Sequence, residues 1–431
     1  MKQINISITA ANGLCSSCGV CKGICPKECI HWNKDGGMYL PQIDASACVS
    51  CGLCASVCPG LGHSYEPKEN AIASVTGNVL ACYNAWSNNP TVRHISASGG
   101  VVSTMVDTLL STKYYDSVFC VDSYDYRNQL VSQRHDIDNF YLDSDKANTP
   151  KSRYLPVSHE QTIRHIKANR NERVIIIATS CALRGITAVI DQLKLKRENY
   201  LLIGLFCDKV FNYNSLSYFE NSFSPNATVE ALHFKNKESG GWPGDMKIFP
   251  ENGSPFYVPL AERAKAKAYF MPERCLYCVD KLNVQADISL GDNYTGINES
   301  PLGSNSVIIR THRGLDAWDA VRGCIEALPV DIKAVQNAQY LEGRLHNLYF
   351  GDLKVKHMNL PLDLNIGVQR EQNSADYSVA WKSNQSRLQS GLVYGKDPSR
   401  LQKQMLRDSK DPNPILSFIR RGYHYIKRKL S

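Results

Sequence analysis

The sequence of 431 residues has no long apolar run, and this excludes a membrane-spanning helix. A helix that crosses a bilayer needs about 20 predominantly apolar residues. The first residues, Met1–Ile6, also lack the apolar segment of a secretory signal peptide. We therefore expect a cytoplasmic protein, and its length indicates two or three domains.

The chain also has little net charge outside its last residues. Five units of the formal charge of +8 lie near the C-terminus, which leaves only +3 for the rest. They come from Arg420, Arg421, Lys427, Arg428 and Lys429. A nucleic-acid-binding protein would carry a broad basic surface, so we expect no nucleic-acid partner.

These terminal charges accompany an apolar stripe. Asp411-Pro412-Asn413-Pro414 introduces a predicted helix, and one of its faces is apolar. That face consists of Ile415, Ile419, Tyr423, Ile426 and Leu430. We favour packing of this face on the protein body. The alternative is peripheral contact with the inner face of a membrane, where the basic residues would meet anionic lipids.

Eight of the sixteen cysteines form one motif that is written twice. The runs are Cys15-x-x-Cys18-x-x-Cys21-x-x-x-Cys25-Pro26 and Cys48-x-x-Cys51-x-x-Cys54-x-x-x-Cys58-Pro59. In bacterial ferredoxins the first three cysteines of each run bind one 4Fe–4S cluster, and the fourth binds the other cluster. Cluster 1 is thus predicted to use Cys15, Cys18, Cys21 and Cys58, and cluster 2 to use Cys48, Cys51, Cys54 and Cys25. Structural zinc does not need a third cysteine at this spacing.

Beyond residue 75 the pattern changes to alternating strands and helices. Apolar runs predict strands at 79–83, 117–121, 174–178, 201–207, 286–292 and 307–311, and helices at 101–110, 182–193 and 314–328. Residues 174–207 read as a βαβ unit, whose two strands are expected to be parallel. Cys181 and Cys207 then lie at the carboxyl edge of the sheet, where open α/β sheets bind ligands.

Cys275 and Cys278 supply a lone C-x-x-C pair, which is half of a metal site. Together with Cys181 and Cys207 they would complete four ligands. The spacing leaves three alternatives open: a third 4Fe–4S cluster, structural zinc, or unligated thiols. Cys324 falls on the apolar face of the helix predicted at 314–328, and we expect it in the core.

Two further segments are candidates for binding an anion. Ser96-Ala97-Ser98-Gly99-Gly100 precedes an apolar helical run, and Ser98 is a good N-cap residue. A glycine pair at a helix start lets an anionic group approach bare amides, although such an entrance is more often a simple turn. Residues 151–154 form a basic-aromatic patch whose simplest interpretation is a solvated loop. No histidine or carboxylate stands out as a general acid, so no catalytic residue is assigned.

The order of these motifs resembles the coenzyme F420 hydrogenase/dehydrogenase beta-subunit family. The shared features are S-A-S-G-G, K-S-R-Y, Thr179-Ser180-Cys181, a strand ending in Gly204-Leu205-Phe206-Cys207, the C-x-x-C pair, and the strand that ends in Gly291-Asp292. The resemblance covers about residues 10–330. Two departures are Ala178–Cys181, where relatives often show G-T-P-C, and Asn293-Tyr294, where they often show an aromatic pair.

The resemblance implies a ferredoxin-like N-terminal domain followed by an α/β flavin-binding body with a mixed, partly parallel sheet. It implies FAD bound by Ser96, Ser98, Gly99 and Gly100 and by Lys151, Ser152, Arg153 and Tyr154. It also implies that Cys181, Cys207, Cys275 and Cys278 bind a third cluster. We expect domains at 1–75, 76–165, 166–334 and 335–431, of which the last is a polar helical extension.

The expected function is that of an FAD-dependent iron–sulfur oxidoreductase. It would pass electrons between a ferredoxin or another redox protein and a small-molecule or glycan-related substrate, in polysaccharide or sugar metabolism. One alternative is a coenzyme F420 dehydrogenase or hydrogenase subunit. Another is a non-catalytic electron-transfer subunit of a larger complex. The sequence leaves the substrate, the direction of electron flow and the oligomeric state open.

Overall fold

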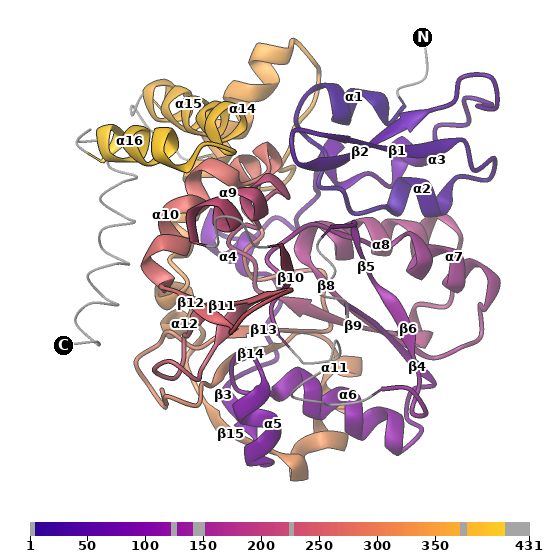
Figure 1. Ribbon diagram of the computed structural model, residues 1–431. Helices are drawn as coiled ribbons and strands as arrows, with labels where there is room; N and C mark the ends of the chain where they lie inside the picture. Colours follow the sequence, from indigo (N-terminus) through magenta and orange to yellow (C-terminus); the bar gives the residue numbers. More distant parts are fainter. Residues whose placement is uncertain (1–4, 122–126, 141–150, 224–227, 371–376, 410–431) are drawn as a thin grey trace.

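The computed structural model describes residues 5–121, 127–140, 151–223, 228–370 and 377–409 (Figure 1). The predicted basic helix at 415–431 lies outside these residues. Within them, no helix combines the length and the apolar character needed to cross a bilayer.

The N-terminal module holds three short helices and a hairpin. They are α1 (Ser7–Ala11), α2 (Val20–Ile24), β1 (Ile30–Asp35), β2 (Met38–Ile43) and α3 (Leu53–Ser56). The pair Gly36-Gly37 in the sequence predicts a short hairpin, and β1 and β2 on either side of it do pair antiparallel. Gly36 and Gly37 have φ of 56° and 76°, as a two-residue turn of this type requires.

The central sheet has eight strands and is mixed, as predicted. In spatial order the strands are β15 (Ile325–Pro329), β3 (Ala81–Ser87), β14 (Asn305–Ile309), β13 (Ile288–Asp292), β9 (Tyr200–Leu205), β8 (Val174–Thr179), β4 (Ser117–Cys120) and β6 (Gln133–His135). β8 and β9 are parallel neighbours from Val174 opposite Tyr200 to Thr179 opposite Leu205, which confirms the βαβ prediction. Both strands are buried apolar runs, as expected for parallel strands covered on two faces.

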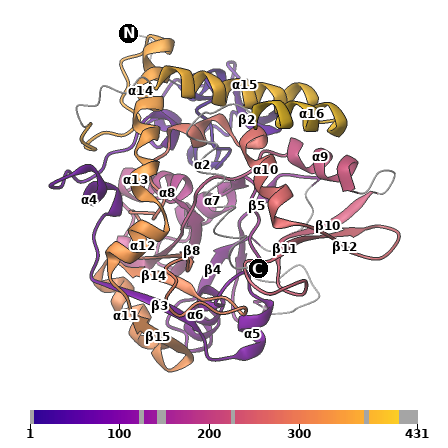
Figure 2. The same cartoon turned by 90° about the vertical axis from the view of Figure 1, so that its left-hand side faces the viewer.

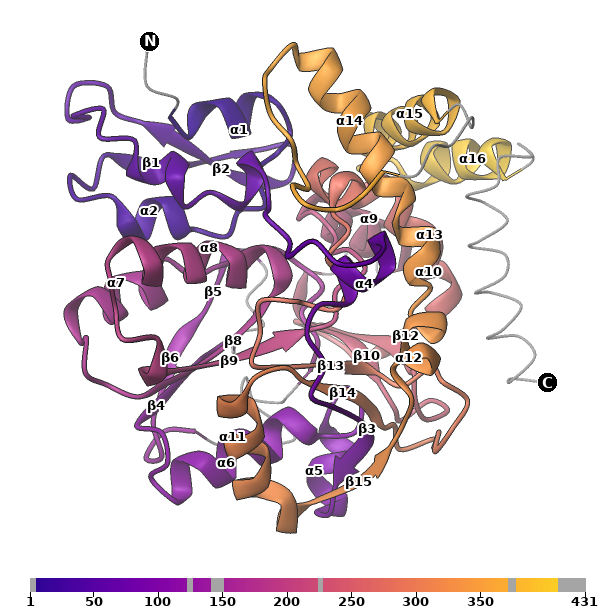
Figure 3. The same cartoon turned by 180° about the vertical axis from the view of Figure 1, so that it is seen from behind.

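Helices cover both faces of this sheet (Figure 3). One face packs against α7 (Glu160–Ala168) and α8 (Ser180–Gln192), and the other against α6 (Val101–Ser111) and α11 (His312–Val321). The N-terminal module rests on α7 and α8 through α2. Gly185 permits this contact, since a Cβ there would lie 2.9 Å from Cγ2 of Val20.

The helix predicted at 314–328 is correct only in its first part. α11 ends at Val321, and Ile325–Pro329 forms the edge strand β15, which pairs antiparallel with β3. Cys324 lies in the turn between them and is exposed, so its expected place in the core is wrong. Pairing with β3 outweighs the helical spacing of the apolar residues, because propensity is a weak signal beside tertiary contacts.

Further elements surround the sheet. Along the chain they are α4 (Ala71–Thr76), α5 (Pro90–Ile95), β5 (Leu130–Val131), β7 (Val157–Ser158), α9 (Asn214–Phe223), β10 (Val229–Asn236), β11 (Asp245–Pro250), β12 (Phe256–Val258) and α10 (Leu260–Phe270). The C-terminal helices are α12 (Ile332–Ala338), α13 (Leu341–Arg344), α14 (His346–Met358), α15 (Ser378–Tyr394) and α16 (Pro398–Asp408). Figure 2 shows α12 to α14 along one side of the molecule and α15 and α16 across its top.

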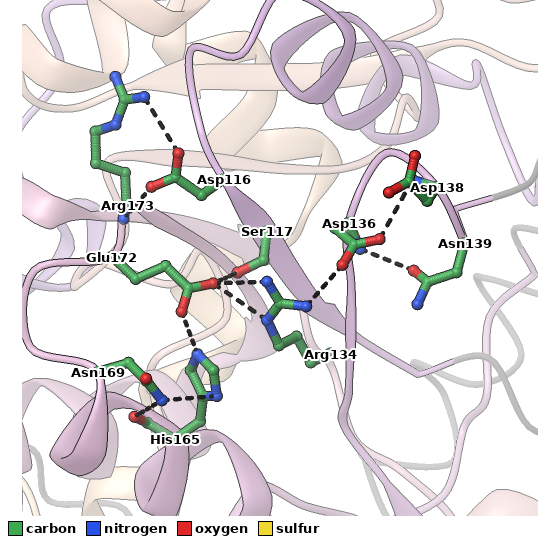
Figure 4. Close-up of polar contacts among 10 residues, drawn as sticks. All are labelled: Asp116, Ser117, Arg134, Asp136, Asp138, Asn139, His165, Asn169, Glu172 and Arg173. Carbon is green, nitrogen blue, oxygen red and sulfur yellow. Dashed lines mark hydrogen bonds and ion pairs between the residues drawn. The ribbon is translucent and has the colours of Figure 1, made fainter.

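A polar network closes the edge of the sheet where β4 and β8 begin (Figure 4). The Glu172 carboxylate accepts hydrogen bonds from Ser117 Oγ at 2.6 Å and from Arg134 Nη2 at 3.0 Å, and it lies 2.6 Å from His165 Nε2. Arg134 also pairs with Asp136 at 2.8 Å. The network therefore joins α7, β4 and β6 to Glu172, which lies two residues before β8.

Replacing Glu172 by glutamine should loosen this edge by about 2 kcal/mol, because Ser117 and Arg134 lose a charged acceptor. Burial raises the pKa of Glu172, but the hydrogen bonds from Ser117, His165 and Arg134 outweigh it and hold the pKa below its usual value. The stabilisation is therefore present at neutral pH and is lost as the pH falls through the folded-state pKa. When Glu172→Gln is purified anaerobically, its backbone amides in β4 and β6 should exchange hydrogen about 30-fold faster at pH 7 than those of the wild type. Unchanged exchange would contradict the role of Glu172, and Asp138→Asn is the control.

Candidate functional site

The carboxyl ends of five strands meet at one edge of the sheet. β4, β8, β9 and β13 are parallel, and β3 runs in the same direction because both β3 and β13 pair antiparallel with β14. Cys181, Cys207 and Asp292 stand at or just beyond three of these ends. The segment Ser96–Gly100 comes after the end of β3, from which it is separated by the helix α5. The topology thus gathers the motifs of the body at one edge.

In the N-terminal module, two cavities are each lined by one predicted ligand set. One is lined by Cys15, Cys18, Cys21 and Cys58, and the other by Cys25, Cys48, Cys51 and Cys54. Across the described residues, no three His, Cys, Asp or Glu side chains meet closely enough to hold a single metal ion. Thiols spread around a cavity suit a cubane of four irons and four sulfides.

The backbone has the same conformation at equivalent positions of the two cysteine runs. Ser17 and Ser50 have φ of 56° and 53°, and Gly19 and Gly52 have φ of 74° and 76°. These left-handed residues turn the chain between successive cysteines, so that the first three thiols of one run can face one cavity. Glycine adopts this conformation without steric cost. The 33-residue repeat is therefore present in the structure as well as in the sequence.

Burial raises the pKa of several thiols that line these cavities. It raises the pKa of Cys58 to about 11 and that of Cys18 to about 12. Without a cluster these two thiols therefore carry protons, and a cluster must displace them, because only the thiolate is a ligand. Cys29, which is off the ligand spacing, is buried, and its sulfur lies 3.6 Å from that of Cys25, beside the second cavity.

The four later cysteines also come together. Cys181 lies in the first turn of α8 and Cys207 follows β9. Cys275 lies in the short 3-10 helix Glu273–Tyr277, which follows α10, and Cys278 lies just after that helix. Burial raises the pKa of Cys207 well above its usual value, and the charges of the other three cysteines raise it further. Cys207 N donates to Lys281 O at 2.9 Å and Ser180 Oγ donates to Asp280 O at 2.8 Å, so the segments that carry the four thiols adjoin one another.

This group also adjoins the first cavity of the N-terminal module. After burial, the largest influence on the pKa of Cys18 is the charge of Cys181. Ser180, which stands where relatives often have proline, donates a hydrogen bond from Oγ to Asp280 O at 2.8 Å. This bond ties the start of α8 to the segment that follows Cys278.

The loop Ser96–Gly100 packs tightly against the sheet edge. A Cβ on Gly99 would lie 2.8 Å from Ala85 O and 2.7 Å from Asn305 Oδ1. The predicted N-cap is wrong: Gly100, with φ of 81°, precedes α6, and Ser98 Oγ instead donates to Ser304 O at 2.7 Å. Ser96 Oγ is buried and has no hydrogen-bond partner among the described residues.

A lysine that the sequence analysis missed holds this loop. Lys237 Nζ donates hydrogen bonds to the carbonyl oxygens of Arg93, Ser98 and Leu302 at 2.6, 2.7 and 2.6 Å. Only 6% of its surface is exposed. Burial and the charge of Lys151 lower its pKa to about 7. Lys237 lies directly after β10 and 139 residues beyond Ser98, and only the fold brings the two residues together. No local motif marks this lysine in the sequence.

The patch at residues 151–154 adjoins this loop, and its side chains are half-buried rather than solvated. Burial lowers the pKa of Lys151 to about 8, and neighbouring cations including Arg153 contribute. The Tyr154 ring lies 5.5 Å from the guanidinium carbon of Arg263 and 5.3 Å from Lys267 Nζ. All eight residues predicted to bind FAD, including Ser152, thus belong to two adjacent segments. The region is strongly electropositive.

Asp292 connects several side chains beside this region. It forms an ion pair with Lys235 and accepts hydrogen bonds from Trp242 Nε1 and Tyr294 Oη, both at 3.2 Å. The Trp242 and Tyr294 rings are 5.1 Å apart. Where relatives often have two consecutive aromatic residues, this chain therefore pairs Tyr294 with a tryptophan from a distant segment.

The basic region and the four later cysteines are neighbours. Lys267 lies over the Tyr154 ring and also pairs with Asp208 Oδ2 at 3.4 Å. Asp208 directly follows Cys207. Phe211 N donates to Tyr154 O at 2.7 Å, so the segment after Cys207 runs along the basic patch.

The N-terminal module has two thiol-lined cavities, and it is docked on a mixed α/β sheet that carries the four later cysteines. This combination defines an iron–sulfur electron-transfer oxidoreductase. The chain belongs to the coenzyme F420 hydrogenase/dehydrogenase beta-subunit family. The models of its N-terminal and C-terminal parts match residues 82–159 and 171–340, together more than half of the chain. A 4Fe–4S dicluster domain model matches residues 14–60, which supports iron–sulfur clusters in the N-terminal module.

One solved structure similar to this chain is the F420-reducing [NiFe] hydrogenase complex from Methanosarcina barkeri. The matched chain is 19% identical, with a TM-score of 0.49, and the match covers 67% of this chain and 97% of that chain. The comparison with curated proteins found no match.

Proposed function

We propose that this chain is an iron–sulfur flavoprotein that transfers electrons between a redox partner protein and coenzyme F420. The observation that carries the proposal is the meeting, at one sheet edge, of the basic loops and the four later cysteines. The family description names coenzyme F420 and hence supports this substrate over a sugar-related one.

The basic region has the properties of a site for FAD. Ser96 Oγ and Arg263 Nη1 are buried polar atoms without a hydrogen-bond partner in the described part of the chain. Burial and neighbouring cations lower the pKa values of Lys151 and Lys237, and a bound polyanion would favour the protonated form of both lysines. We assign the pyrophosphate of FAD to this charge, with Gly100 allowing close approach to the amides at the start of α6.

The thiol groups follow one another from the surface to this site. Cys51 is exposed, so the second cavity is the proposed point of electron exchange with a partner protein. The first cavity adjoins it, because Cys54 adds to the raised pKa of Cys21. The four later cysteines, Cys181, Cys207, Cys275 and Cys278, form the third thiol group, and Cys181 is its member nearest the first cavity. We propose this order for three 4Fe–4S clusters, and domain boundaries after residues 75, 165 and 334.

The protein's own side chains would position the reactants and exclude water. When bound, FAD would exchange single electrons with the clusters and electron pairs with the substrate. Asp292 fixes Lys235, Trp242 and Tyr294 by direct contacts and so shapes one wall beside the flavin region. No residue is assigned as a general acid.

Anaerobic purification followed by flavin analysis and turnover tests the proposal. We expect one FAD per chain, and reduction of coenzyme F420 when reduced ferredoxin is the electron donor. An artificial acceptor in place of coenzyme F420 separates flavin competence from substrate choice. A protein that carries clusters but no flavin and reduces neither acceptor would instead be a non-catalytic electron-transfer subunit.

A further inference from the structure

The C-terminal extension makes a direct contact with the C-x-x-C loop. Asn347 Nδ2, in the first turn of α14, donates to Cys278 O at 2.8 Å and to Cys275 O at 3.4 Å. The family match ends at residue 340, so this contact comes from the part of the chain beyond it. α13 and α14 are therefore fixed against the third thiol group.

Three residues before Asn347, a buried arginine faces Asp208, the residue that follows Cys207. Arg344 ends α13 and is 8% exposed. Its Nη1 lies 3.2 Å from Asp208 Oδ1, while its Nε is buried without a hydrogen-bond partner among the described residues. Asp208 also pairs with Lys267 at 3.4 Å, so one carboxylate faces two cations. The local balance of charge is positive.

The positive charge lies beside this thiol group rather than beside the first cavity. Arg344 pairs with Asp208, the residue after Cys207, and Asn347, three residues further along, donates to the carbonyl oxygens of Cys275 and Cys278. In contrast, no cation is among the residues that line the first cavity. Arg274 lies between the two groups, because its Nη2 donates to Pro59 O at 3.2 Å next to Cys58 and it directly precedes Cys275.

We propose that Arg344 raises the reduction potential of the third cluster above those of the two clusters in the N-terminal module. This inference rests on the third cluster of the proposed function. A reduced cluster carries one more negative charge than an oxidised one, and a buried guanidinium stabilises that added charge strongly because solvent screening is weak there. An electron that leaves a module cluster would then come to rest on the third cluster, beside the flavin region.

Redox titration of the anaerobic protein, followed by electron paramagnetic resonance, tests this role. In Arg344→Gln we expect one of the three cluster potentials to fall, with at least a tenfold change in its equilibrium constant, which is 59 mV for one electron. Arg344→Lys should retain most of the wild-type value. Asp208→Asn should move the same potential upward, since it removes the opposing charge.

The control is Arg370→Gln, which removes an arginine of the same extension that pairs with Asp352 and Asp363. It should leave all three potentials unchanged. About 12 Fe per chain together with an unmoved potential in Arg344→Gln would overturn the role of Arg344 alone. About 8 Fe in the wild-type protein would overturn the third cluster and the role of Arg344 with it, while flavin content and reduction of coenzyme F420 would still decide the proposed function.

Discussion

Replacing both Cys275 and Cys278 by serine is expected to lower the iron content from about 12 to about 8 per chain. A 4Fe–4S cluster needs its thiolate ligands, and the double variant removes two of four. The eight cysteines of the N-terminal module line separate cavities and should keep their clusters. Iron and sulfide assays on anaerobically purified protein measure the difference.

The matched control is Cys324→Ser, because Cys324 is exposed in the turn before β15 and belongs to no thiol group. Its iron content should equal that of the wild type. If the wild-type protein held about 8 Fe and one zinc ion, and the double variant lost the zinc, the third site would be structural zinc. Flavin content serves as a second readout and should survive the loss of the third cluster.

The elements that the sequence predicts correctly are those with local signals. The doubled cysteine run predicts an iron–sulfur module, which the dicluster domain match supports, and the backbone repeats the motif at Gly19 and Gly52. The glycine pair at 36–37 fixes a hairpin in the same way. The apolar run of β8 needs no partner to be recognised as a buried strand. In each case the sequence signal lies in residues that are close together in the chain.

The residues that the sequence analysis missed depend on distant contacts. Lys237 reaches Ser98 across 139 residues, and Trp242 reaches Asp292 across 50. Arg344 lies 137 residues after Cys207 in a polar segment without a motif. A lysine or an arginine in such a segment usually faces solvent, and only the topology shows that these are buried. The same physical reason explains β15, which pairing with β3 converts from an expected helix.

Replacing Lys237 by methionine is expected to weaken FAD binding at least 30-fold. The ammonium group holds the Ser96–Gly100 loop through three carbonyl oxygens, and hydrogen bonds to a charged group contribute about 1.5–3 kcal/mol each. Methionine fills similar space but leaves Ser98 O and Leu302 O without their donor. Titration of flavin-depleted protein with FAD, followed by flavin fluorescence, measures the affinity, and the iron content should not change.

The pH dependence of FAD binding separates a charge effect from a general loss of structure. Burial and neighbouring cations hold the pKa of Lys237 near its lowered value of about 7. An anion favours the protonated form, so binding takes up a proton and the affinity falls as the pH rises above 7. This decline should flatten in Lys237→Met. In the control, Lys247→Met, whose lysine pairs with Glu238 at 2.6 Å, the decline should persist. Wild-type affinity and an unchanged decline in Lys237→Met would show that the pyrophosphate lies elsewhere.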